Sequence, residues 1–291
     1  MAPIKLINKR TYADFTETPR KPRFKDFDNI EYADTYSKWS IHVRVDVKFL
    51  PNKYNDNICF VLMDKTGAKI EATVWGNAEV ARFNRILQLG CKYTIHRVII
   101  SPNAESVEFR AIEHLFECRF DRKTVVEPSL PIEFPILPKH LMPFSDVAKR
   151  PNKTFVDIVG IVVHCCELER FGRYGKYREA IFADAWGNLI AVGIQGLQLI
   201  QSSYLWSTAE GGNPIVIATM LQKDIKFGDL NTSDHTNIAF NPAHRAARPL
   251  QDIRQKIISG AIDMTFVQRF VERRSAFVAM VLAKRDARYR K

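Results

Sequence analysis

The sequence predicts a mainly β fold, with two consecutive five-stranded barrels and a basic helical extension at the C-terminal end. Three observations support this prediction. Short strand patterns separated by turn residues run through most of the 291 residues, as they do in β-barrels. The order of these patterns repeats after about 120 residues, a period that suits tandem domains rather than a solenoid. After Pro249, apolar residues recur at near-helical spacing with cations between them.

The first cycle begins at Trp39, where apolar and polar residues alternate as far as Phe49, the pattern of a half-buried strand. The turn Asp64-Lys65-Thr66-Gly67 divides two of the strands that follow. Strand patterns cover 58–63, 69–75, 93–100 and 107–112, and helical spacing covers 78–89. Three strands, a short helix and two strands are the order of an OB fold, a Greek-key barrel. We expect this first OB fold at 36–125, after a flexible leader at 1–35.

Six prolines mark residues 126–152 as a linker, because proline lacks an amide donor and interrupts regular elements. The second cycle opens with the strand pattern of Phe155 to Val163 and repeats the turn as Asp184-Ala185-Trp186-Gly187. Strand patterns at 180–183, 188–194 and 215–218 and a segment around Phe227 complete it. We expect a second OB fold at 153–245 and a basic helical extension at 246–291.

The charge is unevenly distributed. Residues 245–291 hold twelve Lys and Arg against four Asp and Glu, and so contribute +8 of the net +11. The two barrels are therefore nearly balanced, and any nucleic-acid surface on them must be a local patch. None of the five cysteines forms a CxxC pair and no histidine cluster completes a ligand set, so we expect no metal and no cofactor. No apolar run approaches the ~18–20 residues that span a membrane.

A sequence-tolerant site for single strands needs aromatic faces for the bases and cations for the phosphates. Trp75 lies on the polar face of its strand, opposite Ile70, Ala72 and Val74 on the apolar face. This placement predicts an outward stacking platform. The alternative is that a neighbouring loop covers Trp75. Phe109 alternates with other apolar residues, and this alternation leaves open whether the ring points into the barrel or outward.

The loop at 170–178 interleaves four cations with three aromatic residues and two glycines. Such a hairpin can wrap a single strand through charge, stacking and cation–π contact, although most charged loops are simply solvated tips. The equivalent loop of the first barrel holds a smaller set, Lys53 and Tyr54. The candidate binding residues of the longer loop are Arg170, Phe171, Arg173, Tyr174, Lys176, Tyr177 and Arg178.

The ordered set of motifs resembles the large subunit of replication protein A, the eukaryotic single-strand DNA binder, and especially its plant members. The resemblance covers about residues 36–240. In the first cycle it rests on Trp39-Ser40-Ile41-His42-Val43-Arg44-Val45, on Asp64-Lys65-Thr66-Gly67, on Ile70-Glu71-Ala72-Thr73-Val74-Trp75 and on Phe109 through Glu117. In the second it rests on Val156-Asp157-Ile158-Val159-Gly160, on Asp184-Ala185-Trp186-Gly187 and on Phe227-Gly228.

The resemblance implies that both barrels bind single-stranded DNA, each with two stacking aromatic residues. Trp75 and Phe109 match these positions in the first barrel, and Phe227 matches one of them in the second. Gln195 stands where the family has tryptophan, so the second site lacks one of its two aromatic faces. In the first barrel, Arg44 and Glu117 fall on positions that contact DNA in the family. Glu71 stands where the family has arginine.

We therefore expect a nuclear protein that binds single-stranded DNA in replication, repair or recombination, as a reduced form of the family. No catalytic motif such as G-x-S-x-G or a P-loop is present, so we expect no enzymatic activity. The alternatives are a protein-interaction module, which Gln195 favours, and an RNA-binding protein. Residues 246–291 either pack on the protein itself or dock a partner, and the resemblance points to other replication protein A subunits.

Overall fold

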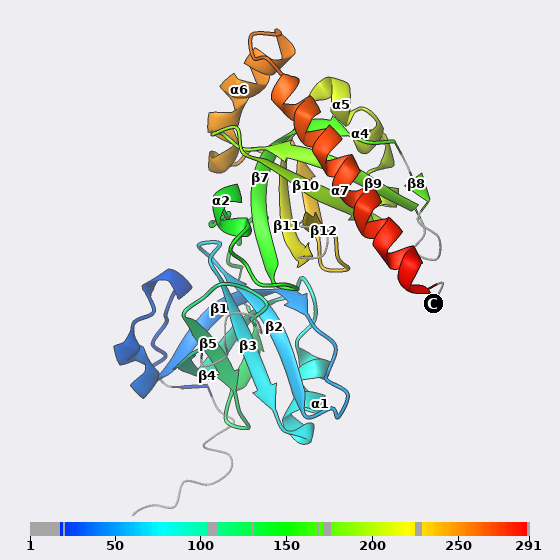
Figure 1. Cartoon of the computed structure of the whole chain (residues 1–291). Coiled ribbons are helices and arrows are strands. Elements are labelled where there is room, and N and C mark those ends of the chain that lie inside the picture. The colour runs from blue at the N-terminus through cyan, green and yellow to red at the C-terminus, as the bar shows by residue number, and fades with distance from the viewer. Residues whose placement is uncertain are drawn as a thin grey trace, which may run out of the picture. The chain divides into compact units, whose positions relative to one another are not determined.

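The computed structural model describes residues 18–19, 21–103, 110–129, 131–167, 169–170, 176–224 and 229–289. It forms two compact units, one spanning 1–104 and 112–139 and the other 105–111 and 140–291. Each unit contains one closed β-barrel, and helices follow the second barrel (Figure 1). The predicted fold class, two five-stranded barrels with a helical C-terminal extension, is confirmed.

The strands of the first barrel pair in the order β1-β2-β3-β5-β4, and β4 also pairs with β1 to close the barrel. Only β3 and β5 run parallel among these neighbours. A sixth strand, β6 (Val125–Pro128), pairs with β4. The strands are β1 (Lys38–Lys48), β2 (Asn57–Asp64), β3 (Lys69–Trp75), β4 (Lys92–Pro102) and β5 (Phe116–Phe120), and helix α1 (Asn77–Ile86) joins β3 to β4.

The fifth strand lies further along the chain than the sequence pattern predicts. Residues 107–112 have the expected alternation, but β5 is formed by Phe116–Phe120, while residues 104–109 lie outside the described part of the chain. Phe116, Cys118 and Phe120 all enter the first core, because alternate residues of β5 face the barrel interior. This segment offers larger apolar side chains to the core than Val107, Phe109 and Ala111 would.

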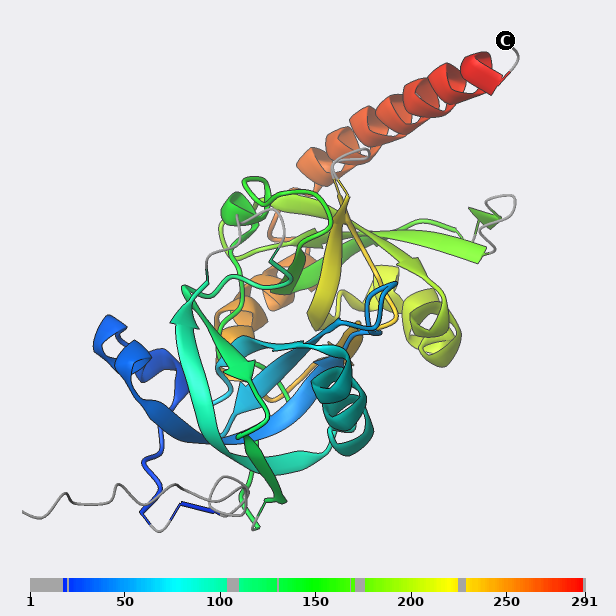
Figure 2. The ribbon, with the colours of Figure 1, turned by 90° about the horizontal axis from the view of Figure 1, so that it is seen from below.

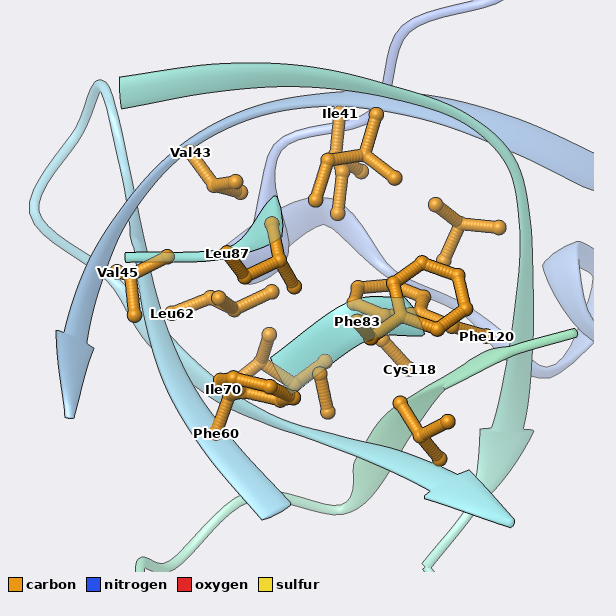
Figure 3. Packing of buried hydrophobic residues seen from close by; sticks show 14 of the residues in the cluster. Ile41, Val43, Val45, Phe60, Leu62, Ile70, Phe83, Leu87, Cys118 and Phe120 are labelled. Carbon is orange, nitrogen blue, oxygen red and sulfur yellow. The ribbon is translucent and has the colours of Figure 1, made fainter. Parts of the chain in front are cut away.

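Alternating residues of the strands fill the interior of the first barrel (Figure 3). Phe83 of α1 and Leu87, which follows the helix, close one end of this core and are fully buried. The side chains labelled in Figure 3 are Ile41, Val43, Val45, Phe60, Leu62, Ile70, Phe83, Leu87, Cys118 and Phe120.

Part of the predicted flexible leader belongs to the first barrel. Short 3-10 turns form at Phe27–Asn29 and Tyr32–Tyr36. Phe27 is 1% exposed and joins the core, and its backbone N–H donates a hydrogen bond to Asp64 Oδ2 at 2.7 Å. The predicted linker is also partly ordered, since it contains the end of β6 and helix α2 (Phe144–Val147). The polar composition of these segments concealed single apolar anchors.

The second barrel repeats the topology of the first. Its strands pair in the order β10-β12-β11-β7-β9, β9 pairs with β10 to close the barrel, and β10 and β12 run parallel, as β3 and β5 do. The barrel strands are β7 (Phe155–Cys165), β9 (Lys176–Ala183), β10 (Leu189–Gln195), β11 (Ile215–Asp224) and β12 (Asp229–Asn231). Two further strands, β8 (Glu169–Arg170) and β13 (Asn237–Phe240), pair with β9 and β11. The short helices α3 (Leu197–Gln201), α4 (Ser203–Ser207) and α5 (Ala209–Gly212) stand where α1 stands in the first barrel.

The C-terminal extension consists of a 3-10 turn (Arg245–Ala247), helix α6 (Arg248–Ile258) and helix α7 (Thr265–Tyr289). Leu250 of α6 and Val267 of α7 are buried in an apolar cluster with residues from the outer face of the second barrel. The later part of α7 extends away from the strands (Figure 2). The extension therefore packs on its own barrel over its first half.

Replacing Phe27 with alanine should destabilise the first barrel by about 3–5 kcal/mol, because it removes a fully buried ring and leaves a cavity. The free energy of unfolding, measured in urea, tests this. Tyr36→Ala is the matched control, since Tyr36 is 90% exposed at the end of the second 3-10 turn, and it should change the free energy by less than about 0.5 kcal/mol. Equal effects of the two substitutions would place Phe27 outside the core.

Candidate nucleic-acid interface

The turn that recurs in the sequence gives the two barrels a common reference point. Asp64 Oδ1 accepts backbone hydrogen bonds from Thr66 and Ala68, and Asp184 Oδ1 accepts the equivalent bonds from Trp186 and Asn188. Each turn ends in a glycine with positive φ, +89° at Gly67 and +81° at Gly187, a conformation that glycine adopts without strain. The strands that flank these turns can therefore be aligned residue by residue.

Trp75 is the last residue of β3 and is 57% exposed. Ile70, Ala72 and Val74 of the same strand are fully buried in the first core. The predicted outward orientation of Trp75 is confirmed, and its role as a stacking platform remains a prediction.

The loop between β1 and β2 lies at the same end of the barrel as Trp75. Asn57, the first residue of β2, pairs with Trp75 in the β2–β3 ladder, and the N–H of Gly76 donates to the carbonyl of Asp56 at 2.8 Å. Tyr54 in this loop is 70% exposed, and Lys53 Nζ lies 5.7 Å from the centre of its ring. Two exposed aromatic rings and a cation therefore share one end of the first barrel, the combination that stacks bases and neutralises phosphate.

Glu117 is buried and accepts hydrogen bonds from two neighbouring side chains. Its carboxylate accepts hydrogen bonds from Thr73 Oγ1 at 3.1 Å and from Arg119 Nε at 2.8 Å. The Arg119 side chain is 46% exposed on β5. Glu117 thus holds an exposed cation beside the strand of Trp75. We did not single out Arg119 from the sequence, although the alternation of Phe116, Cys118 and Phe120 would have placed it on the outer face.

Arg44 and Glu71 are engaged within the first unit. Arg44 Nε donates to Asp46 Oδ1 at 2.8 Å, and Nη1 donates to the carbonyl of Pro135 at 2.6 Å. The Glu71 carboxylate accepts from Asn103 Nδ2 at 3.2 Å and from the backbone N–H of Ile112 at 3.3 Å. A carboxylate can accept this N–H and an arginine cannot, which explains glutamate at this position.

The basic loop of the second barrel is only partly described. Lys176 is exposed at the start of β9, whereas Tyr177 and Arg178 are partly buried. The Tyr177 hydroxyl donates to Glu179 Oε2 at 3.3 Å, and burial, followed by the Glu179 charge, raises the pKa of this hydroxyl above its ordinary value. Arg178 Nη1 lies 3.9 Å from Cys165 Sγ. The other candidates, namely Phe109, Phe171, Arg173, Tyr174, Phe227 and the side chain of Arg170, lie outside the described residues.

Gln195 ends β10 as Trp75 ends β3, and it is likewise exposed. Its amide Nε2 donates to the carbonyl of Thr232 at 3.4 Å. Residues 185–222, which surround it in sequence, contain a single charged residue, Glu210. Several large apolar side chains that follow Gln195 are exposed, with Leu197, Ile200 and Tyr204 all more than half exposed. Residues 185–222 therefore offer no cation to a phosphate backbone. The described cations at this end of the barrel come from β9 instead, where Lys176 and Arg178 flank Tyr177, the partner of Gln195 in the β9–β10 ladder.

Within the described ranges, no three His, Cys, Asp or Glu residues are grouped so as to hold a metal ion. Over the same part of the chain, no helix is both long and apolar enough to cross a membrane.

The sequence of this chain is similar to those of known proteins. Two family models match, "Domain of unknown function DUF223" over residues 31–150 and "Domain of unknown function (DUF8448)" over residues 142–231. The chain is 28% identical over 134 residues to a 70 kDa DNA-binding subunit of replication protein A from Arabidopsis thaliana, covering 43% of this chain and 20% of the relative. It is 26% identical over 174 residues to the corresponding subunit of Drosophila melanogaster, covering 55% and 28%. The chain is homologous to the large subunits of replication protein A.

A solved replication protein A heterotrimer bound to single-stranded DNA also matches, with 17% identity and a TM-score of 0.41, over 81% of this chain and 56% of the matched one. The chain spans less than a third of the length of the two replication protein A relatives that it matches in sequence. The homology confirms the family resemblance that the ordered motifs indicated. The individual binding residues remain predictions.

Trp75→Ala should weaken binding of single-stranded DNA by ~1–3 kcal/mol, or roughly 5- to 150-fold, because one stacked base loses its platform. Fluorescence anisotropy with a labelled oligonucleotide measures this. Trp186→Ala is the matched control, since Trp186 is 78% exposed in the turn between β9 and β10 and should leave the affinity unchanged. A lower thermal unfolding midpoint for Trp75→Ala would assign the ring a packing role instead.

Proposed function

We propose that this chain binds single-stranded DNA through the exposed end of its first barrel and acts in DNA replication, repair or recombination. The observation that carries the proposal is Trp75, more than half exposed at the end of β3 and beside the loop of Lys53 and Tyr54. Both relatives are named as 70 kDa DNA-binding subunits of replication protein A, which supports DNA as the ligand.

The same chemistry favours single strands over duplex. A base can stack on an aromatic side chain only when its face is free, and the faces of paired bases are covered in a duplex. Duplex binding instead depends on many phosphate contacts from an extended basic surface. Outside 245–291 the chain has a net charge of only about +3, so the barrels are poorly suited to that mode.

The proposal includes action in the nucleus, where a eukaryotic relative of replication protein A would meet single-stranded DNA. It contains no catalytic step. Other replication protein A subunits remain proposed partners, and the part of α7 that extends from the second barrel is the segment most open to them.

The full chain should bind a single-stranded DNA oligomer at least about tenfold more tightly than the same sequence as duplex, a difference of roughly 1.4 kcal/mol. Anisotropy titrations at physiological salt test this, and a salt series separates stacking from phosphate neutralisation, because only the latter gives a steep slope. Equal affinity for the two forms would contradict the proposal. Tighter binding of the matching RNA strand would redirect it to RNA.

A further inference from the structure

The outer faces of the two barrels can be compared position by position. In the β1–β2 ladder Arg44 pairs with Met63, and in the β7–β9 ladder Ile161 pairs with Ala183. Met63 and Ala183 each immediately precede the aspartate of the recurring turn, so they are equivalent. Ile161 therefore occupies the position of Arg44.

The register supports this alignment, because both ladders shift at the same point. The shift lies between Val45 and Val47 in β1 and between Val162 and His164 in β7. The residue at the shift is Asp46 in the first barrel and Val163 in the second. The first barrel has an ion pair between Arg44 and Asp46 at these two positions. The second barrel has two apolar residues there.

The same replacement continues across the neighbouring strand. Glu71, Thr73 and Trp75 are the outer residues of β3. Their equivalents in β10 are Ala191, Gly193 and Gln195. The face that carries charged, hydroxyl and aromatic side chains in the first barrel carries small and uncharged ones in the second.

The C-terminal helices cover this apolar face. Ile161, Val163 and Ala191 are buried in one cluster with Leu250 of α6 and Val267 of α7. Apolar residues of the strands would otherwise be exposed to water, which is unfavourable by about 25 cal/mol for each Å². Partly buried side chains of the two helices extend the cluster, namely Ile253, Ile257, Phe270 and Val271.

A nearly buried ion pair fixes α7 on the same face. Arg274 lies two turns beyond Val267, and its Nη2 and Nε lie 3.0 Å and 3.2 Å from Glu179 Oε2 on β9. Glu179 also accepts a hydrogen bond from the Tyr177 hydroxyl. A Cβ added at Gly193 would collide with Asn231 Oδ1 and lie 2.8 Å from the Tyr177 ring. A side chain at position 193 would therefore disturb both Asn231 and the tyrosine that contacts Glu179.

We propose that the outer strand face of the second barrel is a helix-docking surface and that its occupant is the chain's own α6–α7. A helix that docks on this surface needs an apolar stripe to cover the strands. It also needs an arginine, two turns beyond the buried apolar residue, to pair with Glu179. Single-stranded DNA is then bound on the strand face of the first barrel alone, a division of labour that rests on the function proposed above.

The alternative is that α7 is a lid over a masked nucleic-acid site. The composition of the face argues against it. Removing α7 would uncover Ile161, Val163 and Ala191, which offer a phosphate backbone neither charge nor hydrogen bonds. Apolar surface of this kind binds another apolar surface.

The test uses the full chain with Arg274→Ala, and with Arg273→Ala as the matched control, because Arg273 is exposed on the same turn of α7. Hydrogen exchange of the amides of residues 266–281 should accelerate by roughly tenfold or more in Arg274→Ala, because α7 loses its ion pair with the partly buried Glu179, and should not change in Arg273→Ala. The charge exchange Glu179→Arg with Arg274→Glu should restore protection. Arg274→Lys, which keeps the charge but not the two-point contact, should give an intermediate rate even if Arg274→Ala fails to fold.

The affinity for a single-stranded DNA oligomer should stay within about twofold of the parent in all of these variants. A several-fold gain in affinity for Arg274→Ala that persists in the Trp75→Ala background would overturn the proposal and identify a masked nucleic-acid site. Unchanged exchange across the series would overturn it as well. If the parent bound no single-stranded DNA, the proposed function would fail, and the exchange measurements would still decide whether the helix is docked.

Discussion

Closure of each five-stranded sheet on itself, through the β1–β4 and β9–β10 pairings, is the constraint on which the rest of the structure depends. A closed barrel has no free edge, and its interior must be filled with side chains. Because successive residues of a strand point to opposite faces, every second residue is committed to that interior. The remaining residues are free to change, and they are where the two barrels differ.

The outer faces of the two barrels are stabilised in different ways, by hydrogen bonds in the first and by covering helices in the second. In the first barrel, the buried carboxylates of Glu71 and Glu117 are satisfied by hydrogen bonds from neighbouring side chains and one backbone N–H, as buried charges must be. In the second barrel, the equivalent strands are apolar and need a cover, which α6 and α7 supply. The polar face stays open to a ligand at Trp75, whereas the apolar face is closed by the chain itself.

The sequence predicted the features that depend on local periodicity and failed on those that depend on distant partners. The alternation from Trp39 onward and the repeated Asp-turn-Gly motif were enough for the barrels and for the outward orientation of Trp75. Nothing local distinguishes Phe27 from other leader residues, because its burial depends on a barrel formed later in the chain. For the same reason, a basic residue such as Arg44 gave no sign that Asp46 and a carbonyl of the linker would engage it.

The placement of the cations shows why net charge is a poor guide to the binding surface. Most of the excess positive charge lies in the C-terminal extension, yet Arg274 is neutralised by Glu179, and Arg254 Nη2 donates to the carbonyl of Gly212 at 3.0 Å. Both arginines stabilise the docked helices and are not available to phosphate. The first barrel carries little net charge but combines exposed rings with Lys53 at one end. Local pairing of aromatic faces with a cation therefore separates a single-strand site from a merely basic surface.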